Sequence, residues 1–339
     1  MIIVTLLVAA FLAGAGDFPD LLVVVNKSDD TVSILDAKSG ALRATVKTGR
    51  GPHEVEVLAG GKTAAVSDYG KATEPGHSVT LVDLDRGIAL GTVELGEGTR
   101  PHGLASLADG RLLVTAEGTK ELLVVDPKAR RVTTRIPTGR EVSHMVAAPR
   151  DGGAAYVASI GSGTVSAADL SSSKMSKDLA TGAGAEGIDV TPNGREVWVT
   201  NRDANTVTVI DAGKLEVLAT IPAAKFPIRV KITPDGRRAL VSCAQSGDVA
   251  VFDVASRTQV RRISMDREAV AGSEARVFSD RFGKSPVPVG LLIAPDGKRA
   301  WVASTNADVV SVIDLQKLEV VGRLTAGREP DGLAGRFSR

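Results

Sequence analysis

The sequence predicts an all-β protein that folds as a seven-bladed β-propeller, with four antiparallel strands in each blade. Three observations predict this fold. A five-residue phrase occurs seven times along the chain, a tight turn recurs ahead of it, and the two ends of the chain supply complementary parts of one blade. A repeat of about 20–50 residues is typical of solenoids and propellers.

A phrase of apolar residues that ends in aspartate marks one strand of every repeat. The copies are VSILD, VTLVD, LLVVD, VSAAD, VTVID, VAVFD and VSVID, which end at Asp36, Asp83, Asp126, Asp169, Asp211, Asp253 and Asp314. Five of the six spacings between successive aspartates lie between 42 and 47 residues, and the sixth is 61. Units of this length fit the four short strands and the turns of one blade.

The other strands of each unit are placed relative to this phrase. A first strand starts near a proline, as in PHGLASL (101–107), and a tight turn follows it. The clearest turns are ADG, PNG, PDG and PDG at 108–110, 192–194, 234–236 and 295–297. Glycine suits the positive φ that such turns require. A second strand then precedes the aspartate phrase, and a fourth strand, such as LEVLATI (215–221), follows it.

The second strands carry a resemblance to a known family. They read VVVN, AVSD, LVTA, YVAS, WVTN, LVSC and WVAS. Together with the upstream turn and the downstream phrase, they resemble the YVTN-repeat family of seven-bladed β-propellers, of the exported bacterial type. The resemblance covers nearly all of residues 20–339 and implies the fold. It does not imply a function, because this scaffold serves many tasks.

The two ends of the chain predict how the ring closes. After the N-terminal apolar segment, LLVVVNKSDD (21–30) matches only a second strand, and PDGLAGRFSR (330–339) matches only a first strand. The N-terminal strands therefore pair with the C-terminal strand in one shared blade, which leaves no open sheet edge between the ends. We expect residues 20–339 to form a single propeller.

The N-terminus predicts export. Residues 2–13 are apolar but too few for a comfortable membrane span, and Ala13-Gly14-Ala15 fits a signal-peptidase site. We expect residues 1–15 to be a signal peptide, the mature chain to lack a membrane span, and the protein to be periplasmic or secreted. The one cysteine, Cys243, can form no internal disulfide.

The charge balance argues against binding to nucleic acid. With 41 basic and 40 acidic residues, the formal net charge is +1. Such a chain has no overall field to attract a nucleic acid or an anionic membrane. Separately, we expect the protein to be a monomer.

Three of the four histidines share one position in the repeat and predict a site. His53, His102 and His144 each open a first strand in consecutive units, where Glu186 and Asp331 hold the same position in the units on either side. First strands line the channel of a propeller, so these side chains are expected to meet at its mouth. Imidazoles and carboxylates are ligands for copper or zinc. In that hypothesis Glu186 is an extra ligand or general base and Asp331 is its counterpart. In the alternative hypothesis the histidines only hydrogen-bond neighbouring loops.

Arginines and two long loops are expected on the same face. Four arginines lie two to four residues before these positions, namely Arg50, Arg100, Arg140 and Arg328. They are candidates for binding a carboxylate or phosphate, and the alternative is that they are solvated loop arginines without a ligand. The insertion at 264–287 and the loop at 68–78, which contains His77, are candidate lids.

The sequence favours a binding function and leaves enzymatic alternatives open. The leading prediction is an exported binding protein that engages a small anionic molecule or a protein partner at the channel mouth. The first alternative is a metal-dependent oxidoreductase, with copper as the metal considered and the three histidines as ligands. The second is a lactonase- or lyase-type propeller with one divalent cation. Whether the protein is an enzyme stays open, and oxidoreductase chemistry is favoured if it is.

Overall fold

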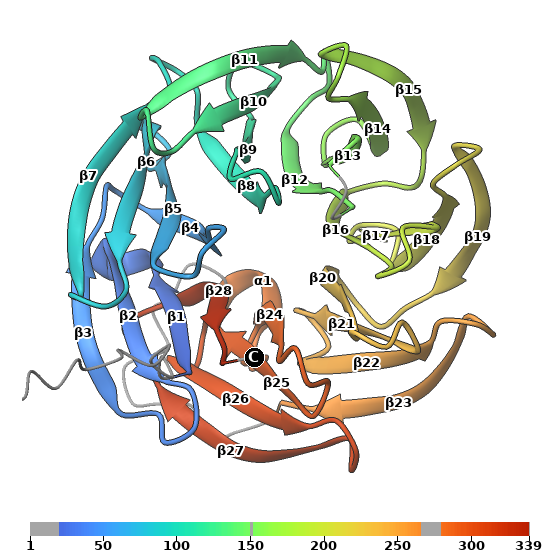
Figure 1. Cartoon of the computed structure of the whole chain (residues 1–339). Helices are drawn as coiled ribbons and strands as arrows, with labels where there is room; N and C mark the ends of the chain where they lie inside the picture. Colours follow the sequence, from blue (N-terminus) through green and yellow to red (C-terminus); the bar gives the residue numbers. More distant parts are fainter. Residues whose placement is uncertain (1–19, 150–151, 266–278, 339) are drawn as a thin grey trace, which may run out of the picture.

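The computed structural model describes residues 20–149, 152–265 and 279–338. These residues form seven four-stranded antiparallel sheets around a central axis, so the predicted seven-bladed propeller is confirmed (Figure 1). The predicted signal peptide lies outside the described residues. Residues 266–278 of the 264–287 insertion also lie outside them. No helix in the described ranges is long and apolar enough to cross a membrane.

Each blade runs from an inner strand beside the channel to an outer strand on the rim. The first blade contains β28 (Pro330–Arg336), β1 (Leu21–Asn26), β2 (Thr31–Asp36) and β3 (Leu42–Lys47). The second contains β4 (Pro52–Val57), β5 (Thr63–Gly70), β6 (Pro75–Asp83) and β7 (Ile88–Glu94), and the third contains β8 (Pro101–Ser106), β9 (Leu112–Ala116), β10 (Glu121–Asp126) and β11 (Arg131–Pro137).

The remaining blades repeat this order. The fourth contains β12 (Ser143–Ala147), β13 (Ala154–Ser159), β14 (Thr164–Asp169) and β15 (Lys174–Ala180), and the fifth contains β16 (Ala185–Val190), β17 (Glu196–Asn201), β18 (Thr206–Asp211) and β19 (Glu216–Pro222). The sixth contains β20 (Pro227–Ile232), β21 (Arg238–Cys243), β22 (Asp248–Asp253) and β23 (Thr258–Ser264), and the seventh contains β24 (Pro288–Ile293), β25 (Arg299–Ser304), β26 (Val309–Asp314) and β27 (Glu319–Thr325). A 3₁₀ turn (Lys27–Asp29) and the short helix α1 (Ser279–Phe282) lie in connections.

The ring closes as the sequence predicts. Strand β1 pairs antiparallel with β28, in a register that places Val23 opposite Ala334 and Val24 opposite Leu333. The N-terminus therefore supplies three strands of the first blade and the C-terminus supplies the fourth.

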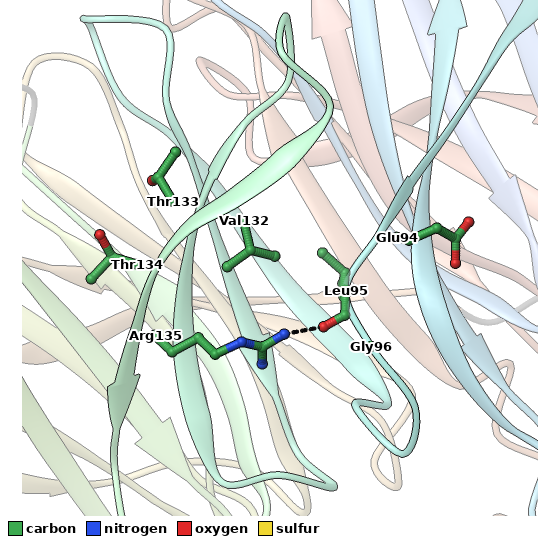
Figure 2. Close-up of a pocket in the computed structure, with 7 residues that line it drawn as sticks. All are labelled: Glu94, Leu95, Gly96, Val132, Thr133, Thr134 and Arg135. Atoms are coloured by element: carbon green, nitrogen blue, oxygen red, sulfur yellow. Dashed lines mark hydrogen bonds between the residues drawn. The ribbon is translucent and has the colours of Figure 1, made fainter.

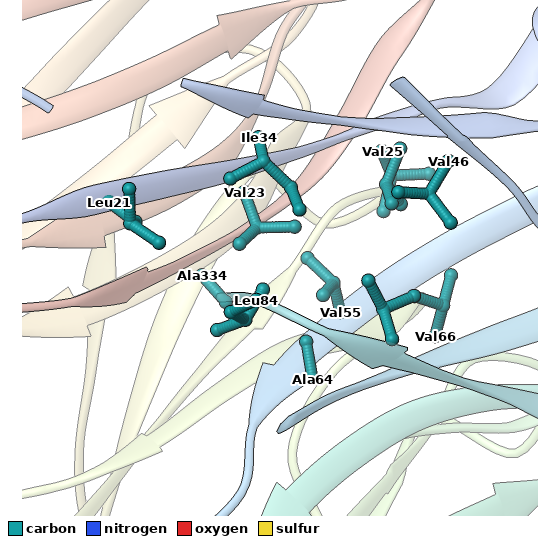
Figure 3. Close-up of a cluster of buried hydrophobic side chains, with 12 residues drawn as sticks. Leu21, Val23, Val25, Ile34, Val46, Val55, Ala64, Val66, Leu84 and Ala334 are labelled. Carbon is teal, nitrogen blue, oxygen red and sulfur yellow. The ribbon is translucent and has the colours of Figure 1, made fainter. Parts of the chain in front are cut away.

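The core lies between neighbouring blades. In the interface between the first two blades, Val23 and Ile34 of one sheet pack against Val55 and Val66 of the next (Figure 3). The middle strands are buried on both faces, as in β1, whereas the outer strand β3 is mostly exposed. Burying a valine or isoleucine side chain stabilises the fold by about 1.5–3 kcal/mol, so these interfaces hold the ring together.

The aspartate that closes each repeated phrase shapes the turn between the third and fourth strands. One carboxylate oxygen of Asp36 accepts hydrogen bonds from the backbone amides of Lys38 and Ser39, at 3.2 and 2.9 Å. Asp83, Asp126, Asp169, Asp211 and Asp314 accept from the same two amide positions. Aspartate recurs there because its side chain replaces a backbone partner in the turn.

A left-handed backbone residue precedes every inner strand and fixes the register of the channel. The seven residues are Gly51, Arg100, Val142, Gly184, Phe226, Val287 and Glu329, with φ between 51° and 75°. This conformation is unfavourable for residues other than glycine, so its recurrence at Phe226 and Val287 shows that the fold imposes it. The residue two positions later points into the channel mouth in each blade.

Candidate functional site

The residues at this register converge on a cavity of about 220 Å³ at the channel mouth. The cavity is lined by Lys27, His53, Tyr69, His102, His144, Glu186, Arg202, Phe226, Ile228, Arg229, Arg281, Val289 and Asp331. The five residues predicted from the repeat, His53, His102, His144, Glu186 and Asp331, are therefore brought together here, and Ile228 and Val289 hold the same position in the other two blades.

The three histidines form a continuous arc. The ring centroids of His53 and His102 are 5.1 Å apart, and those of His102 and His144 are 3.6 Å apart with an interplanar angle of 32°. His53 Nδ1 lies 2.8 Å from the carbonyl oxygen of Gly51, to which it donates. These distances establish only that the three rings lie together, and their role as metal ligands stays a prediction.

Tyr69 and Glu117 complete the arc, and neither is among the site residues predicted from the sequence. Tyr69 comes from the long β5–β6 hairpin, which is the predicted 68–78 loop, and its ring lies 4.1 Å from that of His53. The Tyr69 hydroxyl donates to Glu117 Oε2 at 2.7 Å, and Glu117 Oε1 lies 2.5 Å from His144 Nδ1. His77, in the same hairpin, is exposed and lies 3.6 Å from Glu94 instead.

An ionic network borders the cavity. Glu186 lies 3.4 Å from His144 Nε2, 2.8 Å from Arg202 Nη1 and 3.1 Å from Arg229 Nη1. Arg229 also reaches Glu54, whose strand β4 lies across the channel from β20, with a 2.5 Å contact between Nη2 and Oε1 (Figure 1). An ion-paired bridge from Arg229 to Glu54 therefore spans the channel beside the histidines.

A departure from a glycine pattern explains how this bridge fits. At the position after the channel-facing residue, four inner strands carry glycine: Gly103, Gly187, Gly290 and Gly332. A Cβ on Gly103 would lie 2.6 Å from the carbonyl oxygen of His144, so a side chain there would displace the next inner strand. Glu54, Met145 and Arg229 replace that glycine in β4, β12 and β20, and of these only Glu54 and Arg229 are charged. This exception was a signal in the sequence that could have identified both.

The network assigns different charges to the three histidines. Burial alone would lower the pKa of His144, but the carboxylates of Glu117 and Glu186 outweigh it and raise that pKa. Burial and the Lys27 charge lower the pKa of His53 to about 4, and burial beside the other two histidines lowers the pKa of His102 well below 6.5. Burial would raise the pKa of Glu186, but His144, Arg202 and Arg229 lower it to about 2. The carboxylates therefore favour the imidazolium form of His144, while burial favours the neutral rings of His53 and His102.

A subset of the arc has the spacing of a metal site. One donor atom each of His102, Glu117 and His144 lies within 4.8 Å of the others, and all three residues are buried. This set differs from the predicted one, because Glu117 takes the place of His53. His102 Nδ1 is buried and has no hydrogen-bond partner among the described residues.

The four arginines predicted as ligand-binding groups do not line the cavity. Arg50 pairs with Glu74, Arg140 with Asp178, and Arg328 with Asp29 at 2.6 Å. Arg100 stacks over the Tyr69 ring, 4.4 Å from its centroid. The cations at the cavity are Lys27, Arg202, Arg229 and Arg281.

Arg281 reaches the cavity from α1. Its guanidinium lies 4.6 Å from the centroid of Phe226, and that of Arg202 lies 5.2 Å from the same ring. Phe226, Ile228 and Val289 form an apolar wall beside these cations. Asp331 is paired with Lys27 at 3.3 Å.

A cavity on the rim has a different character. It lies between Glu94–Gly96 and Val132–Arg135, on the outer strands of the second and third blades (Figure 2). The Arg135 guanidinium donates to the carbonyl oxygen of Leu95 and lies 2.9 Å from Glu121. This arginine therefore joins two blades.

Comparisons with known proteins agree on the fold. A sequence model of the YNCE-like beta-propeller family matches residues 91–274, which is more than half of the chain. Comparison with curated proteins finds no match. Among solved structures, the chain is similar to Kuenenia stuttgartiensis hydrazine synthase, with a TM-score of 0.68 and 20% identity over 82% of this chain and 88% of that one. It is also similar to a functionally unknown protein from Desulfotomaculum acetoxidans DSM 771, with a TM-score of 0.75 and 12% identity over 94% of this chain and 99% of that one. Identities this low show the fold alone.

Proposed function

The chain belongs to the YNCE-like β-propeller family, and we propose that it uses this scaffold to bind a small anionic ligand in the cavity at the channel mouth. One observation carries the proposal: the cavity borders the Arg229 bridge and is lined by four Lys or Arg side chains but only two carboxylates. A cavity with a few convergent polar groups and an apolar wall is the usual form of a small-molecule site.

The dimensions and the wall define the ligand. A volume of about 220 Å³ corresponds to roughly seven water molecules, which suits an anion of a few carbon atoms. Phe226, Ile228 and Val289 would contact its apolar part, and the Arg281 guanidinium would bind its carboxylate. Arg281 has the most freedom to do so, because its side chain is 54% exposed and its contact with Asp203 is as long as 3.5 Å.

Calorimetric titration with small carboxylates tests the proposal. Acetate, pyruvate, succinate and citrate would be titrated into the full chain in buffer containing EDTA, with acetamide and succinamide as neutral controls. We expect saturable binding of at least one carboxylate and none of the amides. Arg281→Ala should weaken it about tenfold, the lower end of a charge-assisted hydrogen bond, because this side chain is half-exposed.

Two matched variants decide between this cavity and the arginines expected from the sequence. Arg50 and Arg328 are also exposed, at 63% and 65%, and lie on the same side of the inner strands but outside the cavity. Arg50→Ala and Arg328→Ala should bind the carboxylate as the unsubstituted chain does. If these variants lose binding and Arg281→Ala keeps it, the ligand binds elsewhere.

Export is the second part of the proposal. It is supported by the apolar segment at residues 2–13, the small residues at 13–15 and the resemblance to exported YVTN-repeat propellers. Expressed in a Gram-negative host, the full chain should reach the periplasm and lose about 15 residues, as mass spectrometry of the periplasmic fraction would show. A full-length chain retained in the cytoplasm would contradict export.

The metal-dependent alternatives depend on an ion. Oxidoreductase chemistry on copper or zinc, and lactonase or lyase chemistry on one divalent cation, each need bound metal. The buried cluster of His102, Glu117 and His144 is the observation that favours them.

A further inference from the structure

The donor set of the buried cluster is selective. His102, Glu117 and His144 offer two imidazole nitrogens and one carboxylate oxygen, and these residues are only 2%, 9% and 8% exposed. Two histidines and one carboxylate suit zinc, iron or copper, whereas calcium and magnesium prefer all-oxygen sites.

We propose that His102, Glu117 and His144 bind one divalent transition-metal ion in the wall of the channel-mouth cavity. A tetrahedral zinc ion with bonds of about 2.0–2.1 Å places its donors roughly 3.4 Å apart. The three donor atoms lie within 4.8 Å of one another. Side-chain movements of roughly 1 Å bring them to that spacing, and the ion replaces the hydrogen bond between Glu117 and His144.

Two of the three ligands already have the outer partners that metal ligands need. The Tyr69 hydroxyl donates to Glu117 Oε2 at 2.7 Å, which leaves Oε1 for the ion. Glu186 Oε1 lies 3.4 Å from His144 Nε2, which leaves Nδ1 for the ion. Ligating histidines usually donate their second ring nitrogen to a carboxylate, and ligating carboxylates are themselves hydrogen-bonded.

His102 provides the independent observation. Its Nδ1 is buried without a hydrogen-bond partner in the part of the chain that the structure describes. Buried ring nitrogens are normally paired, since leaving one unpaired costs free energy. Without a metal, His144 would be paired with the carboxylates of Glu117 and Glu186, but His102 Nδ1 would still have no partner among the described residues.

The site differs from the arc of three histidines in one residue. The His53 ring donates through Nδ1 to Gly51 and packs on Tyr69, and it lies outside the cluster. His102 and His144 line the cavity. Three protein ligands therefore leave a coordination position for water or a small anion on the cavity side.

The test uses the full chain, purified without an affinity tag and freed of metal with EDTA. Zn²⁺ is titrated calorimetrically in chelator-free buffer, with Mg²⁺ as the comparison ion. We expect one equivalent of Zn²⁺ and no Mg²⁺ to bind. Glu117→Gln and His102→Ala should each weaken Zn²⁺ binding by at least about tenfold. Glu117→Gln keeps one oxygen acceptor for His144 and turns an amide N–H toward the Tyr69 hydroxyl, which can accept it, so its thermal unfolding should stay cooperative.

Two further variants separate this site from its rivals. His53→Ala should leave Zn²⁺ affinity unchanged, and a large loss there would move the site to the arc of three histidines. His77→Ala should also leave it unchanged, and loss of binding there would show an adventitious surface site at His77 and Glu94. Absence of saturable Zn²⁺ binding, or full affinity in folded Glu117→Gln, would overturn the proposal and establish the metal-free network.

Discussion

Asp68 is a carboxylate at a position where two other blades carry asparagine. In the first and fifth blades, the Nδ2 groups of Asn26 and Asn201 donate to pairs of hydroxyls on the neighbouring strand. Asp68 is 2% exposed and instead accepts from Ser78, Thr80 and the Gly49 amide. Hydroxyl groups can reverse direction, so either side chain fits.

We predict that Asp68→Asn stabilises the protein near neutral pH. Burial raises the pKa of Asp68 from 3.8 to about 6. The folded chain therefore keeps a proton that the unfolded chain releases, and this group's contribution to stability falls as pH rises from about 4 to 6 and stays low above that range. The variant should raise the free energy of unfolding by about 1–3 kcal/mol at pH 7.5 and leave it nearly unchanged near pH 4.

Urea unfolding at both pH values measures the effect. The reciprocal variant Asn201→Asp places a buried carboxyl in the fifth blade and should lose stability with the same pH dependence. A gain in Asp68→Asn that is equal at both pH values would show that charge burial is not its cause.

At the scale of elements, the repeat predicted the positions of the strands and the direction of the side chains that open each inner strand. The strands follow the phrases and turns, and the left-handed residue before each inner strand gives His53, His102 and His144 one direction. Every repeat packs under the same steric conditions, so the conformation of a residue in one repeat predicts that of the equivalent residue in the others.

Elements that depart from the repeat were not predictable in this way. Glu117 lies just after β9, and Tyr69 lies in the long β5–β6 hairpin. The long hairpin that carries Tyr69 has no equivalent in the other blades. Glu117, by contrast, directly follows a second strand, as Lys27 and Arg202 do, so the repeat places it near the channel mouth but does not reveal its contact with His144. A comparison of inner strands could still have found Arg229, since it occupies a position where glycine is usual.

The arginines predicted as ligand-binding groups lie outside the cavity for a related reason. Spacing along the chain placed Arg50, Arg140 and Arg328 near the channel-facing residues. Each lies before or within the connection that enters the inner strand, and each side chain pairs with an acidic residue outside the cavity. Proximity in sequence therefore gave the correct face but not the direction of the side chains.

At the scale of the molecule, closure distributes stability around the ring. The break between the chain ends lies inside the first blade, between β28 and β1, where the two strands are joined by backbone hydrogen bonds. Neighbouring blades, by contrast, meet through side chains, as in the cluster of Val23, Val55 and Val66. Opening the ring at its chain ends therefore requires breaking a sheet as well as a packed interface.

Circular permutation tests this account. Residues 20 and 338 lie together, since the Ser338 amide donates to Asp20 at 2.6 Å, and a short linker can join them. New ends between β7 and β8, at exposed Glu97, place the break between blades. New ends between β4 and β5, at exposed Gly60, keep the break inside a blade and serve as the control.

We predict that the permutant opened between blades is less stable than the control by a few kcal/mol. Its ends are held by side-chain packing alone, whereas the control's broken blade retains a ladder of backbone bonds that contribute about 1 kcal/mol each. Urea midpoints and unfolding rates of the two permutants measure the difference. The loops at both new ends are exposed, so local strain affects both similarly. Equal midpoints would mean that side-chain packing between blades, rather than the backbone pairing of strands from the two chain ends, keeps the ring closed.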